Sequence, residues 1–183
     1  MASLTKICLH WTGGNSTPCK KDLDSYHFCV DSDGRIYLGT YAPEDNIDCK
    51  DGKYAKHCGG GNTGCIGIAA CGMVGFNMQK KETKAPLTRA QVEAICCLAA
   101  YCSIKYNFLI NENTVFTHYE FDRQQPTFKG KIDIIYLPFL PNLQIIRVGG
   151  YFRNKITWYR KKLKEGNYKL ERIGNYYEFT HIN

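Results

Sequence analysis

The chain has 183 residues, enough for one domain or for one domain with a small appendage, and its 44% hydrophobic content suffices for a sizeable core and argues against disorder. No apolar run approaches the roughly 20 residues needed to cross a bilayer, so we expect no transmembrane segment. The net charge of +7 is unevenly spread: residues 1–140 carry 15 Lys and Arg against 14 Asp and Glu, whereas residues 141–183 carry 9 against 3.

The first predicted element is an apolar strand that ends in His10 and is followed by Trp11, Thr12 and two glycines. Because this strand starts near residue 4, no room is left for a cleaved signal peptide. We therefore expect synthesis in the cytoplasm, so that any activity outside that compartment requires another route of release. In that setting the ten cysteines are expected to be reduced.

The middle of the chain alternates strand, loop and helix patterns. Two short strand-like runs flank Asp33-Gly34 and predict a hairpin over residues 26–39. A Gly-rich loop from His57 to Gly64 precedes a buried strand over residues 66–74, and the pair His57-Cys58 in it could hold a metal. Thr88 and Gln91 form a capping box that starts a helix over residues 89–105. No Cys-x-x-Cys pair occurs, which disfavours a zinc ribbon.

The composition changes after Pro138 and Pro141. Three runs rich in aromatic and β-branched residues, 156–163, 168–173 and 176–182, are separated by Gly-Asn turns and predict a β-meander. A short basic helix over 158–164 is the alternative for the first run. We expect residues 1–140 to form the main domain and residues 141–183 a basic, aromatic extension, either packed on that domain or forming a small appendage.

Two histidines and one carboxylate stand out as a potential zinc site: His10 at the end of the first strand, His118 after another strand-like run, and Asp133. Imidazole and carboxylate suit Zn²⁺, and three protein ligands leave one coordination position for water, as in catalytic rather than structural sites. This set predicts a hydrolase. Each residue alone is more often an ordinary surface or core residue, so the prediction depends on the set.

These motifs, taken in order, resemble the type 2 N-acetylmuramoyl-L-alanine amidase family, which includes phage endolysins, bacterial recycling amidases and peptidoglycan recognition proteins. The resemblance covers roughly residues 4–137. It is carried by His10 with Thr12, Tyr26-His27-Phe28 before Asp33-Gly34, His57 with its Gly-rich loop before Ile66-Gly67-Ile68, the helix from Thr88, His118-x-Glu120 and Lys131-x-Asp133. It implies an α/β fold, with a mixed twisted β-sheet flanked by helices and a zinc cleft on one face.

The resemblance also implies roles for individual residues. The zinc ligands are His10, His118 and Asp133, and the catalytic polar groups are Tyr26, which orients water or shuttles its proton, and Lys131, which stabilises the oxyanion. We further expect Glu120 to support a ligand imidazole. Substrate contacts are expected from Trp11, Thr12 and His57.

The implied activity is zinc-dependent hydrolysis of the amide bond between N-acetylmuramic acid and L-alanine in peptidoglycan. Recycling members of the family carry a catalytic glutamate in the strand that corresponds to residues 66–74, and this chain has no acidic residue there, which favours a phage-type endolysin made in a host cytoplasm. The long spacing between His118 and Asp133 leaves Asp122 as a competing third ligand. The segment between His10 and Tyr26 leaves room only for a short helix over residues 19–24.

Three other functions stay open at this point: a cytoplasmic muropeptide-recycling amidase, a peptidoglycan-binding module that does not cut, and a nucleic-acid-binding protein. The last would depend on the basic residues 141–183, which lie outside the recognisable motifs, so we expect no specific nucleic-acid partner. Those residues are instead expected to attract anionic polymers of the cell wall.

Overall fold

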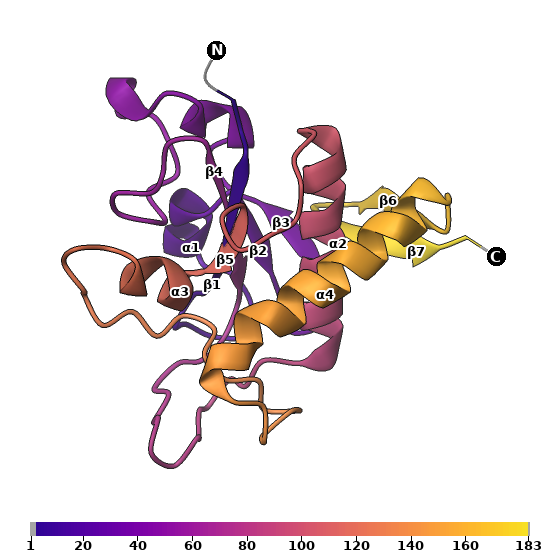
Figure 1. Ribbon diagram of the computed structural model, residues 1–183. Helices are drawn as coiled ribbons and strands as arrows, with labels where there is room; N and C mark the ends of the chain where they lie inside the picture. Colours follow the sequence, from indigo (N-terminus) through magenta and orange to yellow (C-terminus); the bar gives the residue numbers. More distant parts are fainter. Residues whose placement is uncertain (1–2, 183) are drawn as a thin grey trace.

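A mixed β-sheet runs through the molecule in the computed structural model, which describes residues 3–182 (Figure 1). Its strands are β1 (Lys6–Trp11), β2 (Phe28–Val30), β3 (Ile36–Leu38), β4 (Cys65–Ala70), β5 (Val115–Thr117), β6 (Tyr168–Ile173) and β7 (Tyr176–His181). They form one seven-stranded sheet in the order β5-β1-β4-β2-β3-β7-β6. The first four in this order are parallel, and the remaining pairs are antiparallel. The expected α/β class with a mixed sheet and flanking helices is confirmed.

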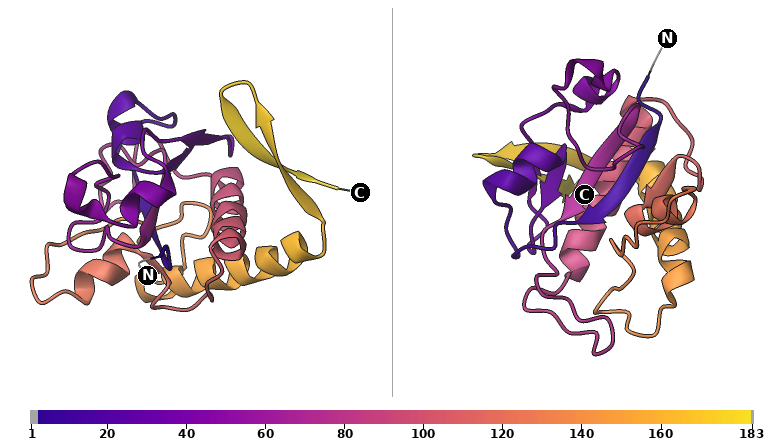
Figure 2. Two further views of the ribbon diagram at one scale, coloured as in Figure 1. Left: turned by 90° about the horizontal axis from the view of Figure 1, so that it is seen from above. Right: turned by 90° about the vertical axis from the view of Figure 1, so that its left-hand side faces the viewer.

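The helices are α1 (Lys20–Ser25), α2 (Arg89–Lys105), α3 (His118–Arg123) and α4 (Ile145–Lys164), with short 3-10 turns η1 (Pro43–Asn46) and η2 (Cys49–Asp51). The two long helices, α2 and α4, pack against each other, and α2 also contacts β4 (Figures 1 and 2). Within residues 3–182 no helix has the length and apolar character that crossing a membrane requires.

Alternation along β1 gives the sheet two different faces. Ile7, Leu9 and Trp11 belong to the main hydrophobic core, which also includes buried residues of α2 and α4. Successive side chains of a strand point to opposite faces, so Cys8 and His10 face the other side. His10 is fully buried there. The strand therefore places a histidine on the face away from the two long helices.

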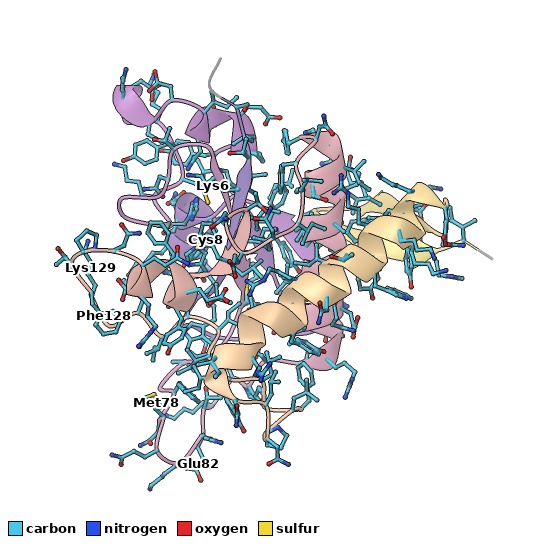
Figure 3. The ribbon with its side chains drawn as sticks, viewed as in Figure 1. Lys6, Cys8, Met78, Glu82, Phe128 and Lys129 are labelled. Carbon is cyan, nitrogen blue, oxygen red and sulfur yellow. The ribbon has the colours of Figure 1, made fainter. Side chains whose placement is uncertain are left out.

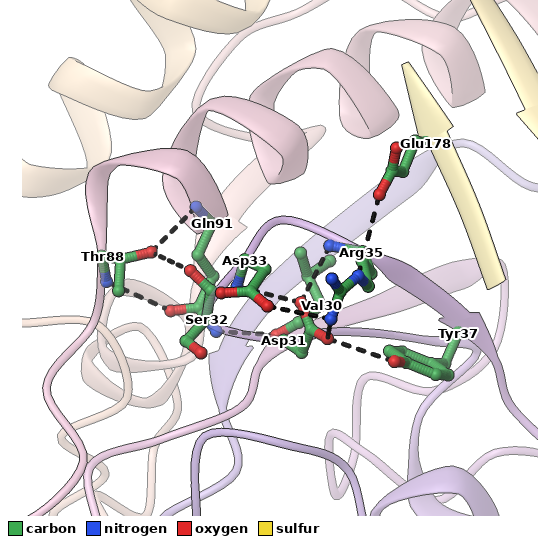
Figure 4. Close-up of polar contacts among 9 residues, drawn as sticks. All are labelled: Val30, Asp31, Ser32, Asp33, Arg35, Tyr37, Thr88, Gln91 and Glu178. Atoms are coloured by element: carbon green, nitrogen blue, oxygen red, sulfur yellow. Dashed lines mark hydrogen bonds and ion pairs between the residues drawn. The ribbon is translucent and has the colours of Figure 1, made fainter. Parts of the chain in front are cut away.

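The predicted hairpin and the predicted helix are both present, and side chains join them. β2 pairs with β3, and the turn between them includes Gly34 at a φ of +88°, a conformation that favours glycine. Thr88 accepts a hydrogen bond from the backbone of Gln91 at the start of α2. The Gln91 amide donates to the Val30 carbonyl at 2.7 Å, and the Thr88 hydroxyl donates to Ser32 (Figure 4). This capping box thus fixes α2 to the end of β2.

The predicted three-stranded meander is wrong in its first strand. Residues 156–163 lie in α4, a 20-residue helix, and only β6 and β7 form a hairpin. Val148, Phe152, Ile156 and Tyr159 are buried along one side of α4, at helical spacing. The alternative for this run, a short basic helix over residues 158–164, has the right type but covers only the last part of α4.

The C-terminal elements share the core of the molecule. α4 packs on α2, and β7 pairs with β3 through Ile36 and Tyr177. Figure 2 shows the hairpin projecting at the end that the last turns of α4 reach. The limits of 1–140 and 141–183 as separate units stay a prediction.

Candidate active site

The three predicted zinc ligands meet at one edge of the sheet. β1 and β5 are parallel neighbours, so their carboxyl ends lie together, with His10 near the end of β1 and His118 directly after β5. Asp133 reaches them from the loop after α3, and its Oδ2 atom lies 3.0 Å from Nδ1 of His10 and 2.9 Å from Nδ1 of His118. The ligand atoms of all three residues lie within 4.8 Å of one another.

His57 determines which nitrogen of His10 is available. The Nε2 atom of His57 lies 3.1 Å from the Cys65 carbonyl, which only accepts, so this nitrogen carries the proton of a neutral ring. Burial and the nearby histidines hold the pKa of His57 well below its ordinary value, so the ring is neutral. Its Nδ1 atom is then an acceptor, and it lies 3.1 Å from Nε2 of His10. His10 therefore donates from Nε2.

This arrangement leaves Nδ1 of His10 with a lone pair directed at a carboxylate. Burial lowers the pKa of His10, so the ring has one N–H for two acceptors, His57 and Asp133. Two acceptors 3.0 Å apart repel each other unless a cation lies between them. A zinc ion satisfies this requirement, because tetrahedral zinc holds nitrogen and oxygen ligands about 3.3 Å apart. The donor set thus fits zinc in identity and spacing.

The carboxylate of the cluster is ionised. Burial alone raises the pKa of Asp133, whereas the hydrogen bond from the His118 ring and the charge of that ring lower it and favour the ionised carboxylate. For His118, burial lowers the pKa, and the contacts with Asp133 and Cys58 reverse this and raise it to about 9. Binding of a metal ion by His118 would therefore displace a proton.

Asp122, the competing third ligand, has a different role. It is buried, and its carboxylate accepts the backbone N–H of Lys129 at 3.1 Å and that of Lys131 at 2.8 Å. These bonds fix the loop between α3 and Asp133. Both possible metal clusters within residues 3–182 lack Asp122.

The second cluster contains Cys8, His10 and His57, all buried. It is a poorer zinc site than the first. Both nitrogens of His57 already have partners, and burial raises the pKa of the Cys8 thiol, so the sulfur stays protonated.

Tyr26 and Lys131 both lie near the cluster. The Tyr26 ring centroid is 5.1 Å from that of His10, and burial together with the charge of Asp133 raises the pKa of Tyr26, so its hydroxyl stays protonated. Lys131 is exposed and lines a cavity of 510 Å³ that also reaches His118. The other residues around this cavity are Lys56, His57, Gly59, Gly60, Phe121, Asp122, Gln125, Pro126, Thr127 and Lys129.

Glu120, expected to support a ligand imidazole, uses both carboxylate oxygens in other contacts. Its carboxylate accepts the backbone N–H of Thr117 at 3.0 Å and forms a two-pronged ion pair with Arg153 of α4, with both distances 3.0 Å. A Cβ atom on Gly149 would collide with this carboxylate. Glu120 therefore caps α3 and joins it to α4.

The three predicted substrate contacts are constrained by their surroundings. Trp11 is 6% exposed and packs on Phe76, so little of its surface can meet a substrate. The Thr12 hydroxyl accepts from the backbone of Gly14 and Gly72 and keeps its own proton to donate. His57 lines the cavity, but its ring nitrogens face His10 and Cys65. Residue spacing along the chain does not predict the contacts that link Cys65, His57 and His10.

A family model described as N-acetylmuramoyl-L-alanine amidase matches residues 2–133. The chain belongs to this family. The matched range ends at Asp133, so it contains all three residues of the metal cluster. Among curated proteins no sequence matches the chain significantly.

Among solved structures, the chain is similar to a complex of the N-acetylmuramyl-L-alanine amidase AmiD from E. coli with anhydro-N-acetylmuramic acid-L-Ala-D-gamma-Glu-L-Lys. The identity is 19% and the TM-score 0.46. The match covers 67% of this chain and 51% of the other, so the chain spans about half the length of that protein.

Proposed function

We propose that the protein is a zinc-dependent N-acetylmuramoyl-L-alanine amidase that cleaves the amide bond between N-acetylmuramic acid and L-alanine. The observation that carries this proposal is the convergence of His10, His118 and Asp133, whose ligand atoms all lie within 4.8 Å of one another. These three residues would hold the metal. The chemistry that zinc supplies when bound is Lewis acidity, which makes water nucleophilic near neutral pH and polarises a carbonyl.

The chain's own groups account for the remaining steps. Tyr26 keeps its proton because burial raises its pKa, so its hydroxyl can donate a hydrogen bond or orient water beside His10. Lys131 lies two residues from Asp133 on the loop fixed by Asp122, and it lines the cavity beside His118. A positive charge there stabilises the oxyanion that forms as water attacks the carbonyl.

We place the enzyme in the phage-type, tyrosine-using group, acting as an endolysin on the cell wall after synthesis in a host cytoplasm. β4 contains no acidic residue, which supports this assignment over a recycling amidase. The basic C-terminal elements would hold the enzyme on anionic wall polymers. Lys161 and Lys164 are exposed in the last turn of α4 and supply part of that charge.

The test is digestion of purified peptidoglycan followed by mass spectrometry of the products. The proposal predicts release of stem peptides with a free L-alanine amino group, and loss of this release after chelation of the metal. Retention of peptidoglycan without cleavage, in protein loaded with zinc, would instead support a recognition module. Cleavage at a different bond would contradict the assigned reaction.

A further inference from the structure

We propose that the peptide stem of the substrate lies in the cavity beside His118, where Lys56 and Lys129 bind the α-carboxylate of its D-glutamate. This inference rests on the proposed amidase function. It adds which side of the metal cluster the peptide stem occupies and which carboxylate of the stem is bound. Lys131, which is placed beside the scissile bond, is not part of this proposal.

The cavity lining has a net positive charge, because its three lysines outnumber one aspartate. Three lysines line it, and none of them forms an ion pair with any residue from 3 to 182. Asp122 is the single acidic residue of the lining, and the backbone N–H groups of the 129–131 loop use its oxygens. The Nζ atom of Lys56 lies 5.4 Å from the centre of the Tyr54 ring, a cation–π contact and not an ion pair.

Two residues of the cavity lining, Gly59 and Gly60, have no side chain. A Cβ atom on Gly59 would meet only the Nζ atom of Lys129, at 3.9 Å, and one on Gly60 would meet nothing within 4 Å. The Lys129 ammonium group therefore lies over Gly59, from the loop after α3. Figure 3 labels Lys129 with Phe128 on that loop. Lys56 and Lys129 reach the cavity from two different segments, the loop that carries His57 and the loop after α3.

The substrate has its negative charge on one side of the scissile bond. The lactyl carboxyl group of N-acetylmuramic acid is consumed in that bond, the sugar is neutral, and the carboxyl group of L-alanine is consumed in the next amide. The first free carboxylate belongs to D-glutamate, which is linked through its γ-carboxyl group. A cavity with three unpaired ammonium groups next to a metal ligand thus suits the peptide and not the sugar.

The experiment compares two substrates, N-acetylmuramoyl-L-Ala-D-γ-Glu-L-Lys and the same peptide with D-isoglutamine, which replaces the α-carboxylate by an amide. The zinc-loaded parent should prefer the acid. In Lys56→Ala and in Lys129→Ala, kcat/KM for the acid should fall about fivefold through KM, because an exposed ion pair contributes up to about 1 kcal/mol. The ratio of acid to amide should fall by the same factor. Lys53→Ala, on the same segment as Lys56 but outside the cavity, is the control.

Equal kcat/KM of the parent for acid and amide would overturn the proposal, as would an equal loss on both substrates in the lysine variants. If the parent cleaves neither peptide, the amidase function fails and calorimetry still decides the binding site. The parent should then bind the acid more tightly than the amide, and Lys129→Ala should remove this difference. Equal binding of the two peptides by the parent would overturn the carboxylate site on its own.

Discussion

The hydrogen-bond chain from Cys65 through His57 to His10 is the residue-scale feature that connects this fold to metal chemistry. Each member determines which nitrogen of the next ring carries the proton. The last nitrogen, Nδ1 of His10, therefore keeps a lone pair that can bind a metal ion. His57 packs directly on Gly67, since a Cβ atom there would overlap the His57 ring. The absence of a side chain at residue 67 therefore allows this ring to reach His10.

Replacing His57 by leucine removes the acceptor for His10 while keeping an apolar side chain of similar size. We expect zinc affinity to fall about 10- to 100-fold, the range typical of losing a group that orients a metal ligand. His57→Asn returns an acceptor near the position of Nδ1 and should recover part of the loss. The measurement is competition with a chromophoric chelator. Parent-like zinc affinity in His57→Leu would contradict the orienting role.

Tyr26 and Lys131 are expected to act on the reaction and not on the metal. Tyr26→Phe and Lys131→Ala should each retain about one zinc per chain and lose about 10²-fold or more in turnover, the range for removing a proton-transfer group or an oxyanion donor. Steady-state kinetics on a soluble muropeptide, with elemental analysis of the same samples, tests both parts. Two variants that cleave at the parent rate would eliminate the proposed mechanism.

At the scale of elements, α3 connects the site to the long helix α4. His118 and Glu120 lie on the same short helix, with one at the metal cluster and the other paired with Arg153. Asp122, one turn on, holds the loop that carries Lys131 and leads to Asp133. The six-residue helix α3 thus positions a proposed zinc ligand, a contact with α4 and the loop that carries Lys131.

Glu120→Gln separates the structural role of Glu120 from a role at the metal. Because the variant breaks a part-buried, two-pronged ion pair, the free energy of unfolding should fall by about 1–3 kcal/mol. Zinc affinity of the folded protein should stay unchanged, since Glu120 contacts no ligand imidazole. Glu112→Gln, at an exposed position, is the control. Urea unfolding and zinc titration measure the two quantities, and a weaker zinc affinity would restore the earlier prediction.

At the scale of the whole molecule, the sequence predicted elements with strong local signals and missed those that depend on distant partners. Thr88 with Gln91 is a local capping signal, and Asp33-Gly34 is a local turn signal. The helix α2 and the β2–β3 hairpin that they predict are both present. Residues 156–163 mix aromatic and basic side chains in a way that fits a strand or a helix, and packing on α2 decides for the helix.

The candidate site divides in the same way. The residue types and their order along the chain indicated His10, His118 and Asp133, which the structure brings together. The partners of Glu120 and His57 could not be predicted from the sequence. Glu120 contacts Arg153 and His57 contacts Cys65, and both contacts depend on how α4 and β4 pack in the folded chain. The sequence also left Asp122 as a competitor of Asp133 for the third ligand position. The conformation of the loop between them, which determines which carboxylate faces the histidines, has no local sequence signal.

The basic C-terminal surface gives a prediction at this scale. Neutralising Lys161 and Lys164 to glutamine should weaken sedimentation with purified cell walls at low salt, because exposed charges act over about 10 Å at 0.1 M ionic strength. Hydrolysis of a small soluble muropeptide should change little, as both lysines lie away from the metal cluster. Lys50→Gln with Lys53→Gln, near η2, is the matched control. Unchanged wall binding would leave these lysines with a solubilising role alone.

The zinc content of the purified protein, measured together with activity in the parent and in His118→Ala, tests the central claim most directly. The account predicts about one zinc per chain in the parent, as expected for a single three-ligand site, and loss of both zinc and peptidoglycan cleavage in the variant. A His118→Ala protein that contains no zinc and cleaves peptidoglycan at the parent rate would contradict it.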